Sequence, residues 1–164
     1  MFKYIKLAYL KNIGQGMIKD YDIRPLEKKD QEQWHYIWGE YLEFYETELP
    51  SKIYSETFSR LIDINNRHQN CLVAYSEETL FGLVHYIFHP HNWRTDDVCY
   101  LQDLFTLKKQ RRKGIAKALI QAVYEAADAN ETSSVYWMTQ DFNLGARKLY
   151  DQVASLTPFI KYQR

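Results

Sequence analysis

The sequence predicts an α/β fold in which a mixed β-sheet carries helices on both faces. Short apolar runs typical of buried strands alternate with stretches of helical period, in the expected order β-α-α-β-β-β-α-β-α-β. The expected strands at 98–107 and 134–138 are joined by one helix, and such a crossover makes two strands parallel. The 164 residues suit one domain with a sizeable core and are too few for two ordinary domains.

The first half of the chain is expected to supply three strands and two helices. Residues 1–16 are interpreted as an N-terminal extension and 17–164 as a single domain, since Met17 directly precedes the first convincing strand, 21–26. A helix is expected from Asp30, a suitable N-cap, with these apolar positions on one face: Trp34, Ile37, Trp38, Tyr41, Leu42 and Tyr45. A second helix at 51–64 and strands at 71–75 and 80–88 follow.

The second half is expected to alternate strands and helices. After the strand at 98–107, an amphipathic pattern beginning near Gly114 runs to about Asn130. A short strand at 135–138, a helix at 143–153 and a closing strand at 158–162 complete the expected elements.

Composition and charge exclude several classes of function. Lys plus Arg and Asp plus Glu number 21 each, so the net charge is zero, and non-specific binding to nucleic acid or anionic membrane is disfavoured. No apolar span reaches the roughly 20 residues that cross a bilayer, and no signal peptide is recognised. Cys71 and Cys99 lack a Cys-x-x-Cys pattern, which favours free thiols in a cytoplasmic protein and leaves one disulfide open.

A basic turn behind the central strand is suited to holding phosphate. The apolar run Tyr100–Thr106 leads to Arg111-Arg112-Lys113-Gly114-Ile115-Ala116, where the amphipathic pattern begins. The first turn of a helix exposes unpaired N–H groups and the positive end of its dipole, and a glycine lets a ligand approach the backbone. A solvated basic turn would also explain this run taken alone.

The spacing Arg-x-x-Gly-x-Ala at 111–116 resembles the acyl-CoA pyrophosphate loop of the GNAT superfamily of N-acyltransferases. A second pattern, Asn-x-x-Ala-x-x-x-Tyr from Asn143 to Tyr150, is similar to the CoA-facing helix of that superfamily and places the two residues on one helical face. The resemblance covers about 21–164 and is strongest to the branch named for histone and small-amine acetyltransferases. Gln102 departs from the Glu of many polyamine-type members.

The resemblance implies a GNAT-like acyl-CoA N-acyltransferase fold, splayed parallel central strands and acetyl-CoA as cosubstrate. The pantetheine arm would pair with the open edge of the central strand near Leu104, Phe105 and Thr106, aided by a bulge. The expected cofactor-binding residues are Leu104, Phe105, Thr106, Arg111, Arg112, Lys113, Gly114, Ile115, Ala116, Asn143 and Tyr150. A homodimer is also what the resemblance suggests, and no metal is expected.

Acetyl transfer to an amine needs a base and an acid. An alkylammonium with a pKa of about 10 must lose a proton before it attacks, and the candidates are Asp103, Tyr100 and His85. Asp103 is the preferred base, although a structural role for it is an equal alternative. Tyr150 is protonated at neutral pH and is the candidate acid for the leaving thiolate, whose conjugate acid has a pKa near 8.5.

The function predicted is acetyl transfer from acetyl-CoA to a primary amine of a small molecule, such as an amine, a polyamine or an amino acid. Transfer to a protein or peptide amine and a catalytically silent CoA sensor are the alternatives. A nucleic-acid contact at 108–113 and a metal site at His85, His89 and His91 are weaker possibilities. The helix at 30–45 is read as core that could also form a wall of the acceptor site.

Overall fold

The structure is built on a five-stranded sheet with the strands in chain order, β1-β2-β3-β4-β5. This computed structural model describes residues 20–164, so the expected extension at 1–16 and the expected domain start lie outside the described residues. The strands are β1 (Asp22–Pro25), β2 (Gln69–Ser76), β3 (Thr79–His89), β4 (Val98–Thr106) and β5 (Val135–Tyr136). The first four pair antiparallel and β4 pairs parallel with β5, which confirms the predicted mixed sheet.

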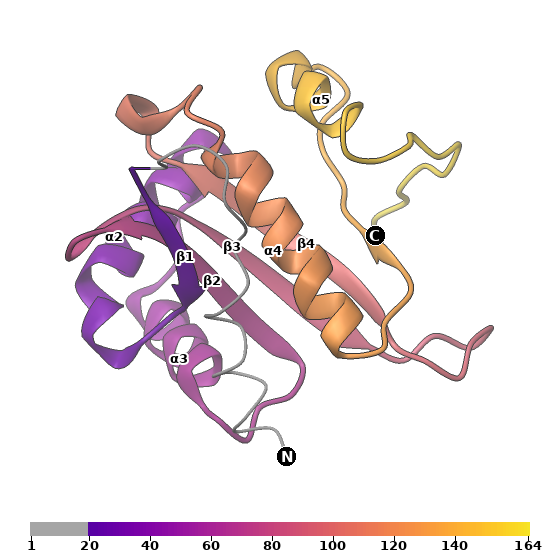
Figure 1. Ribbon diagram of the computed structural model, residues 1–164, viewed down its shortest axis with the longest axis horizontal. Coiled ribbons are helices and arrows are strands. Elements are labelled where there is room, and N and C mark those ends of the chain that lie inside the picture. The colour runs from indigo at the N-terminus through magenta and orange to yellow at the C-terminus, as the bar shows by residue number, and fades with distance from the viewer. Residues whose placement is uncertain (1–19) are drawn as a thin grey trace.

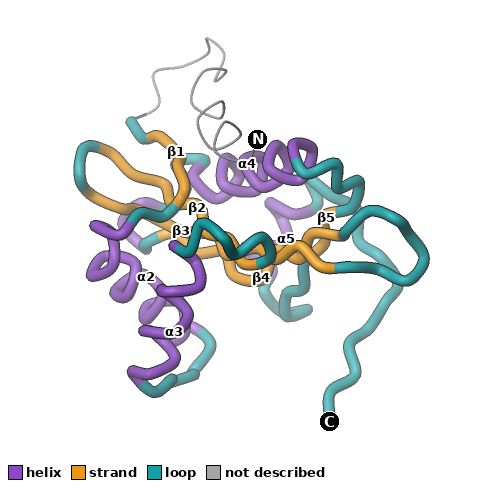
Figure 2. The backbone as a smooth tube through the Cα atoms, turned by 90° about the horizontal axis from the view of Figure 1, so that it is seen from below, coloured by secondary structure: helices purple, strands orange, loops and turns teal. Residues whose placement is uncertain are grey.

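Helices cover both faces of the sheet, as expected. Helices α2 (Gln31–Phe44) and α3 (Ser51–Ile62) lie on one face, and α4 (Ile115–Ala129) lies on the other (Figure 2). Two hydrophobic clusters result, one between the sheet and α4 and one between the sheet and the helices α2 and α3. Helix α5 (Leu144–Tyr150) stands apart, beyond the edge that β4 and β5 form (Figure 1). The short 3₁₀ helices η1 (Lys28–Asp30) and η2 (Lys108–Gln110) precede α2 and α4.

The junction between β1 and α2 is held by a buried ion pair. The Arg24 guanidinium donates to both carboxylate oxygens of Asp30 at 2.6 and 2.8 Å, and the Glu27 N–H donates to Asp30 Oδ2 at 2.8 Å. Burial opposes the ionisation of Asp30, but these hydrogen bonds outweigh it and lower the pKa. Asp30 stands at the N-cap position of α2 without a side-chain capping bond, because its oxygens are used by Arg24 and Glu27.

A β-bulge at Gln102 changes which face the side chains of β4 occupy. His85 pairs with Asp103 and Tyr86 pairs with Leu101, so Gln102 is an extra residue in β4. Before the bulge Leu101 packs toward α4; after it Leu104 packs there as well, while Phe105 joins the cluster under α2 and α3. A bulge also bends its strand and increases the local twist.

The parallel strands β4 and β5 separate after two paired positions. Strand β5 pairs with β4 only at Cys99↔Val135 and Tyr100↔Tyr136. Beyond Tyr100, no strand in the described part of the chain pairs with this edge of β4. The predicted splay, and the predicted bulge beside it, are therefore present.

The expected closing strand at 158–162 is wrong. Residues 154–164 have no helix or strand, and Phe159 and Tyr162 are 84% and 88% exposed. A strand needs a neighbour to satisfy its backbone groups and cover its apolar face, and β5 is only two residues long. The apolar residues of this segment therefore have no partner strand within residues 20–164.

Candidate functional site

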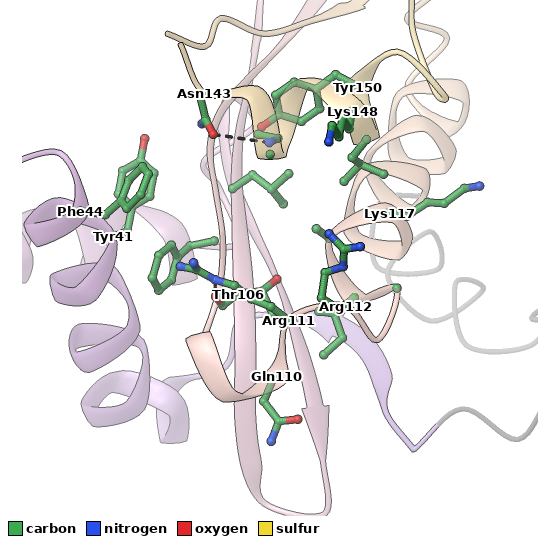
Figure 3. A pocket seen from close by; sticks show the side chains of 18 of the residues that line it. Tyr41, Phe44, Thr106, Gln110, Arg111, Arg112, Lys117, Asn143, Lys148 and Tyr150 are labelled. Carbon is green, nitrogen blue, oxygen red and sulfur yellow. Dashed lines mark hydrogen bonds between the residues drawn. The ribbon is translucent and has the colours of Figure 1, made fainter. Parts of the chain in front are cut away.

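A cleft of about 590 Å³ lies between the open edge of β4 and helix α5. The loop before α4 forms one end, and the C-terminal end of α2 forms a side wall (Figure 3). Its lining residues are Tyr41, Phe44, Tyr45, Leu104, Phe105, Thr106, Gln110, Arg111, Arg112, Gly114, Ile115, Ala116, Lys117, Asn143, Gly145, Ala146, Lys148, Leu149, Tyr150 and Gln152.

The loop before α4 has the backbone conformation that a phosphate site needs. Gly114 is the N-cap of α4 with φ +82° and ψ 0°, a left-handed conformation that favours glycine. Arg112 is also left-handed, with φ +65°. The first N–H groups of α4 follow at Ile115 and Ala116, both of which line the cleft. Arg111 Nε–H donates to the Thr106 carbonyl at 3.1 Å and ties the loop to the end of β4.

The cleft is cationic although the whole chain is neutral. Arg111, Arg112, Lys117 and Lys148 line it, and no Asp or Glu is among the described residues that do so. Lys113 was expected at this site, but it is not among the lining residues, and its ammonium donates to Gln110 Oε1 at 2.7 Å. A concentration of one sign of charge in a concave site attracts anionic ligands.

Helix α5 carries Asn143 and Tyr150 to the cleft, as the helical spacing predicted. Asn143 caps the helix, its Oδ1 accepting from the Ala146 N–H at 3.4 Å, while Tyr150 projects from the last turn (Figure 3). The Tyr150 ring packs edge-on against Trp137, with centroids 5.3 Å apart. Burial raises the pKa of the Tyr150 phenol to about 12, so the phenol is protonated at neutral pH.

A buried hydrogen-bond network lies on the opposite side of β4. Trp34 Nε1–H donates to His85 Nε2 at 2.9 Å. An indole nitrogen only donates, so His85 Nε2 carries no proton and the ring proton is on Nδ1. Nδ1–H then donates to Asp103 Oδ2 at 2.8 Å, and this oxygen also accepts from Trp38 Nε1–H at 3.2 Å. His85 is therefore neutral, and Asp103 is the anionic end of the network.

Three phenols lie near Asp103, and two of them reach the cleft. Burial, and next the negative charge of Asp103, raise the pKa values of Tyr41, Tyr45 and Tyr100. Tyr41 and Tyr45 also line the cleft. Asp103 consequently lies next to the cleft without being one of its lining residues.

A second cavity of about 260 Å³ opens on the other side of Asp103, between the sheet and α3. Its lining residues are Trp38, Leu49, Ile53, Thr57, Arg60, Leu61, Gln69, Asn70, His85, Tyr86, Ile87, Gln102 and Asp103. The first cleft thus combines four cations with aromatic and apolar side chains, and the second cavity combines apolar side chains with one carboxylate, one guanidinium and a few neutral polar groups.

The histidines considered for a metal site are not brought together. His85 is held by Trp34 and Asp103, His89 hydrogen-bonds to Tyr136 at 3.0 Å, and the His91 ring contacts Trp93. Among residues 20–164 no group of three or more His, Cys, Asp or Glu side chains could hold a metal ion.

Both cysteines are free and buried, and burial raises the pKa of the Cys99 thiol to about 12. No helix in the described part of the chain is long and apolar enough to span a membrane.

The sequence profile of the acetyltransferase (GNAT) family matches residues 29–154, which include the loop, the splayed strands and α5. The chain belongs to the GNAT acetyltransferase family. It is an N-acetyltransferase by this membership and by a relative, a D-amino-acid N-acetyltransferase of Saccharomyces cerevisiae. The two sequences are 36% identical over 144 residues, covering 87% of this chain and 89% of the relative.

Solved structures share the GNAT fold. A ribosomal-protein-alanine N-acetyltransferase of Brucella melitensis biovar Abortus 2308 superposes with a TM-score of 0.74 at 24% identity, covering 88% of this chain and 97% of that one. The aminoglycoside N-acetyltransferase AAC(6′)-Iy in complex with CoA gives 0.76 at 18% identity, covering 93% and 98%. The GNAT-like α/β fold inferred from the sequence is confirmed.

Nearly all of the GNAT cofactor residues inferred from the sequence line one cleft, with Lys113 the exception. Sequence reasoning missed Lys117 and Lys148, which lie on α4 and α5. The sequence does indicate both residues. Lys117 stands in the first turn of the helix that follows Gly114, and Lys148 is separated from Tyr150 by a single residue. The second cavity had no sequence signal, since its lining comes from five separate segments of the chain.

Proposed function

We propose that the chain transfers the acetyl group of acetyl-CoA to the primary amine of a small molecule, by direct attack in a ternary complex. One observation carries the proposal. A cleft lined by four cations, and by no carboxylate among the described residues, runs from the first turn of α4 along an unpaired strand edge to a protonated phenol. These features fit, in order, the diphosphate, the amide-bearing arm and the sulfur of acetyl-CoA.

In this proposal Arg111, Arg112 and the N–H groups of residues 114–116 bind the diphosphate. The backbone of β4 at Leu104, Phe105 and Thr106 pairs with the pantetheine arm as an added strand would, and Asn143 orients a pantetheine amide. Backbone N–H groups near Leu104 and Phe105 stabilise the negative charge that develops on the thioester oxygen.

Asp103 acts on the acceptor in this proposal. A protonated amine is attracted to a carboxylate that is anionic and close to the cleft, and its proton passes to Asp103, directly or through water. The neutral amine then attacks the thioester carbonyl. His85 positions the carboxylate and does not take the proton, because its Nε2 is occupied by the Trp34 N–H.

Tyr150 supplies the proton to the departing thiolate, and the second proton that the attacking nitrogen loses as the amide forms passes through water and restores the phenol. Its phenol lines the cleft, and with a pKa of about 12 it is fully protonated in the range where CoA thiol would be partly ionised. The Saccharomyces cerevisiae relative is named for D-amino acids, which supports a small amine as the acceptor. A peptide amine is the alternative acceptor, and a CoA sensor is the alternative without catalysis.

Calorimetry with acetyl-CoA, followed by a thiol-release assay over polyamines, amino acids, aminoglycosides and basic peptides, tests the proposal. We expect micromolar binding of acetyl-CoA and turnover with one class of small amine. Binding without turnover on any amine indicates the sensor, and turnover confined to the peptides indicates the alternative acceptor. Failure to bind acetyl-CoA contradicts the proposal altogether.

We also propose a cytoplasmic homodimer. The C-terminal segment exposes Leu156, Phe159 and Ile160, with exposed fractions of 75% to 84%, and a second copy would cover this apolar surface. Two free buried thiols suit a reducing compartment. Light scattering should give twice the mass of 19.7 kDa, and Phe159→Asp should reduce the dimer. A monomeric wild type would contradict the dimer.

A further inference from the structure

Beyond the residues that handle the acetyl group, the second cavity has the chemistry of a site for a molecule with opposite charges at its two ends. Its lining contains one carboxylate, Asp103, and one guanidinium, Arg60. Apolar side chains, among them Trp38, Ile53 and Leu61, also line the cavity, and Gln69 and Asn70 add neutral polar groups. A volume of about 260 Å³ suits a small metabolite and excludes a folded surface.

The Arg60 guanidinium is available for a ligand. It lies in the last turn of α3, and its Nη2–H donates to Thr57 Oγ1 at 3.1 Å. Among residues 20–164 Arg60 forms no ion pair, whereas Arg24 is held by the carboxylate of Asp30. A guanidinium has five donors in a planar fork, which matches a carboxylate in a two-pronged arrangement.

The carboxylate of the cavity lies next to the cleft. Asp103 lines the second cavity, and its neighbour Tyr41 lines the cleft. An ammonium group bound by Asp103 is therefore close to the open edge of β4, while the rest of the same molecule extends toward Arg60. The hydrogen bonds from Trp38 and His85 fix the Asp103 carboxylate in place without a ligand.

We infer that this cavity binds an amine that also carries a carboxylate, an amino acid, with Arg60 as the residue that selects it. The inference rests on the proposed function and deepens it by naming the acceptor class. Arg60 discriminates in both directions. It attracts the carboxylate, and it repels the second ammonium of a polyamine, so that diamines of similar length are excluded.

Acceptor amines that differ only in their carboxylate test the inference. We compare phenylalanine, phenylalaninamide and phenethylamine, with both enantiomers of the first two, and then β-alanine and γ-aminobutyrate, which lengthen the distance between the charges. The expected kcat/KM for the best amino acid exceeds that for its amide by about tenfold to 100-fold, the range of one charged hydrogen-bonded pair.

Two variants of helix α3 separate the role of Arg60 from a general effect. Arg60→Gln should lower kcat/KM for amino acids by about tenfold to 100-fold through KM, and should leave the amides and kcat unchanged. Arg60→Lys should recover part of the loss, since it retains the charge and loses the fork. Lys52→Gln removes an exposed cation of the same helix that lies outside the cavity and should change nothing.

A binding measurement makes the result independent of turnover. Protein saturated with CoA is titrated with the amino acid by calorimetry, for wild type and for Arg60→Gln. Weaker binding to the variant by about tenfold supports the inference. Equal binding, or equal losses for acids and amides, overturns it. Loss of CoA binding, or acetylation of no amine by the wild type, contradicts the proposed function instead, so the two failures are distinct.

Discussion

The two sides of strand β4 are built in contrasting ways. On the side of α2 and α3, the Asp103 carboxylate accepts from Trp38 and His85, and His85 in turn accepts from Trp34, so side chains satisfy one another inside the protein. At the edge facing α5, the backbone beyond Tyr100 has no strand partner in the described chain, and cations from the loop and α5 line the cleft.

This difference separates what the fold needs from what a ligand needs. Polar groups in the enclosed network already have partners, so removing one leaves others buried and unsatisfied. Groups at the open edge are solvated until a ligand arrives, so removing one costs the free protein little. Substitutions in the network should therefore affect stability, and substitutions in the cleft should affect only binding or turnover.

Tyr150→Phe gives the largest expected effect. The substitution removes one hydroxyl from the cleft and keeps the ring that packs on Trp137. We expect kcat to fall by about 100-fold or more, the usual contribution of a general acid, while acetyl-CoA affinity and the unfolding free energy stay near wild type. Steady-state kinetics and calorimetry measure this. Unchanged kcat would remove Tyr150 from the mechanism.

Asp103→Ala should cost about 3 kcal/mol of unfolding free energy, because the N–H donors of Trp38 and His85 lose their acceptor in the interior. Urea denaturation measures the loss. Asp103→Asn serves as the matched variant, since it keeps one oxygen acceptor and should cost less. If both variants retain wild-type stability, the network contributes nothing to the fold and the contrast between the two sides fails.

Gly82→Ala should destabilise the sheet by about 2 kcal/mol. A Cβ at Gly82 would lie 2.5 Å from the Phe105 carbonyl oxygen, in the part of β4 that borders the cleft. Gly39→Ala is the control. Gly39 lies in α2, and a Cβ there would meet only the Tyr54 hydroxyl of α3, at 3.6 Å. The control should be neutral or stabilising by up to about 1 kcal/mol. Equal thermal midpoints for both variants would show that β3 and β4 can separate at no cost.

Arg112→Asn should weaken acetyl-CoA binding by about tenfold at low salt and less at high salt. Asparagine tolerates the left-handed backbone of this position, so the charge is removed with little strain. Lys113→Gln, at the neighbouring position that does not line the cleft, is the comparison and should bind as the wild type does. Calorimetry at two salt concentrations measures the acetyl-CoA affinity of both variants. If both bind acetyl-CoA as the wild type does, the charge of the loop does not contribute to binding.

The smallest effect concerns alkaline pH. The folded-state pKa of Tyr150 is raised from 10.0 to about 12, so its contribution to stability is fully present below pH 10 and is lost as the pH rises toward 12. Between pH 7 and 10 the unfolding free energy should show no loss from this group. Turnover should rise with pH as the acceptor amine loses its proton, without a falling limb from Tyr150 below pH 10. A falling limb near pH 8 that Tyr150→Phe abolishes would contradict this assignment.

Local patterns predicted the open edge better than the enclosed side. Gly114 and the Asn143-to-Tyr150 spacing are properties of short segments, so the sequence contains them directly. The Trp34–His85 hydrogen bond joins residues far apart in the chain, and Arg60 reaches the second cavity only because α3 packs on the sheet at β2. The apolar run at 158–162 predicts a strand, and this prediction is wrong because pairing depends on a neighbouring strand that the segment itself cannot supply.

The extra residue Gln102 bends β4 and so helps to keep the edge of this strand open. His85 faces Asp103 and Tyr86 faces Leu101, so a chain lacking Gln102 could keep both cross-strand partners in immediate succession. Every core side chain would stay in its layer, but the bend would be gone, and a straightened β4 could go on pairing with the chain after Tyr136. Deletion of Gln102 would then leave the core packed and close the open edge of β4 through continued pairing with the chain after β5.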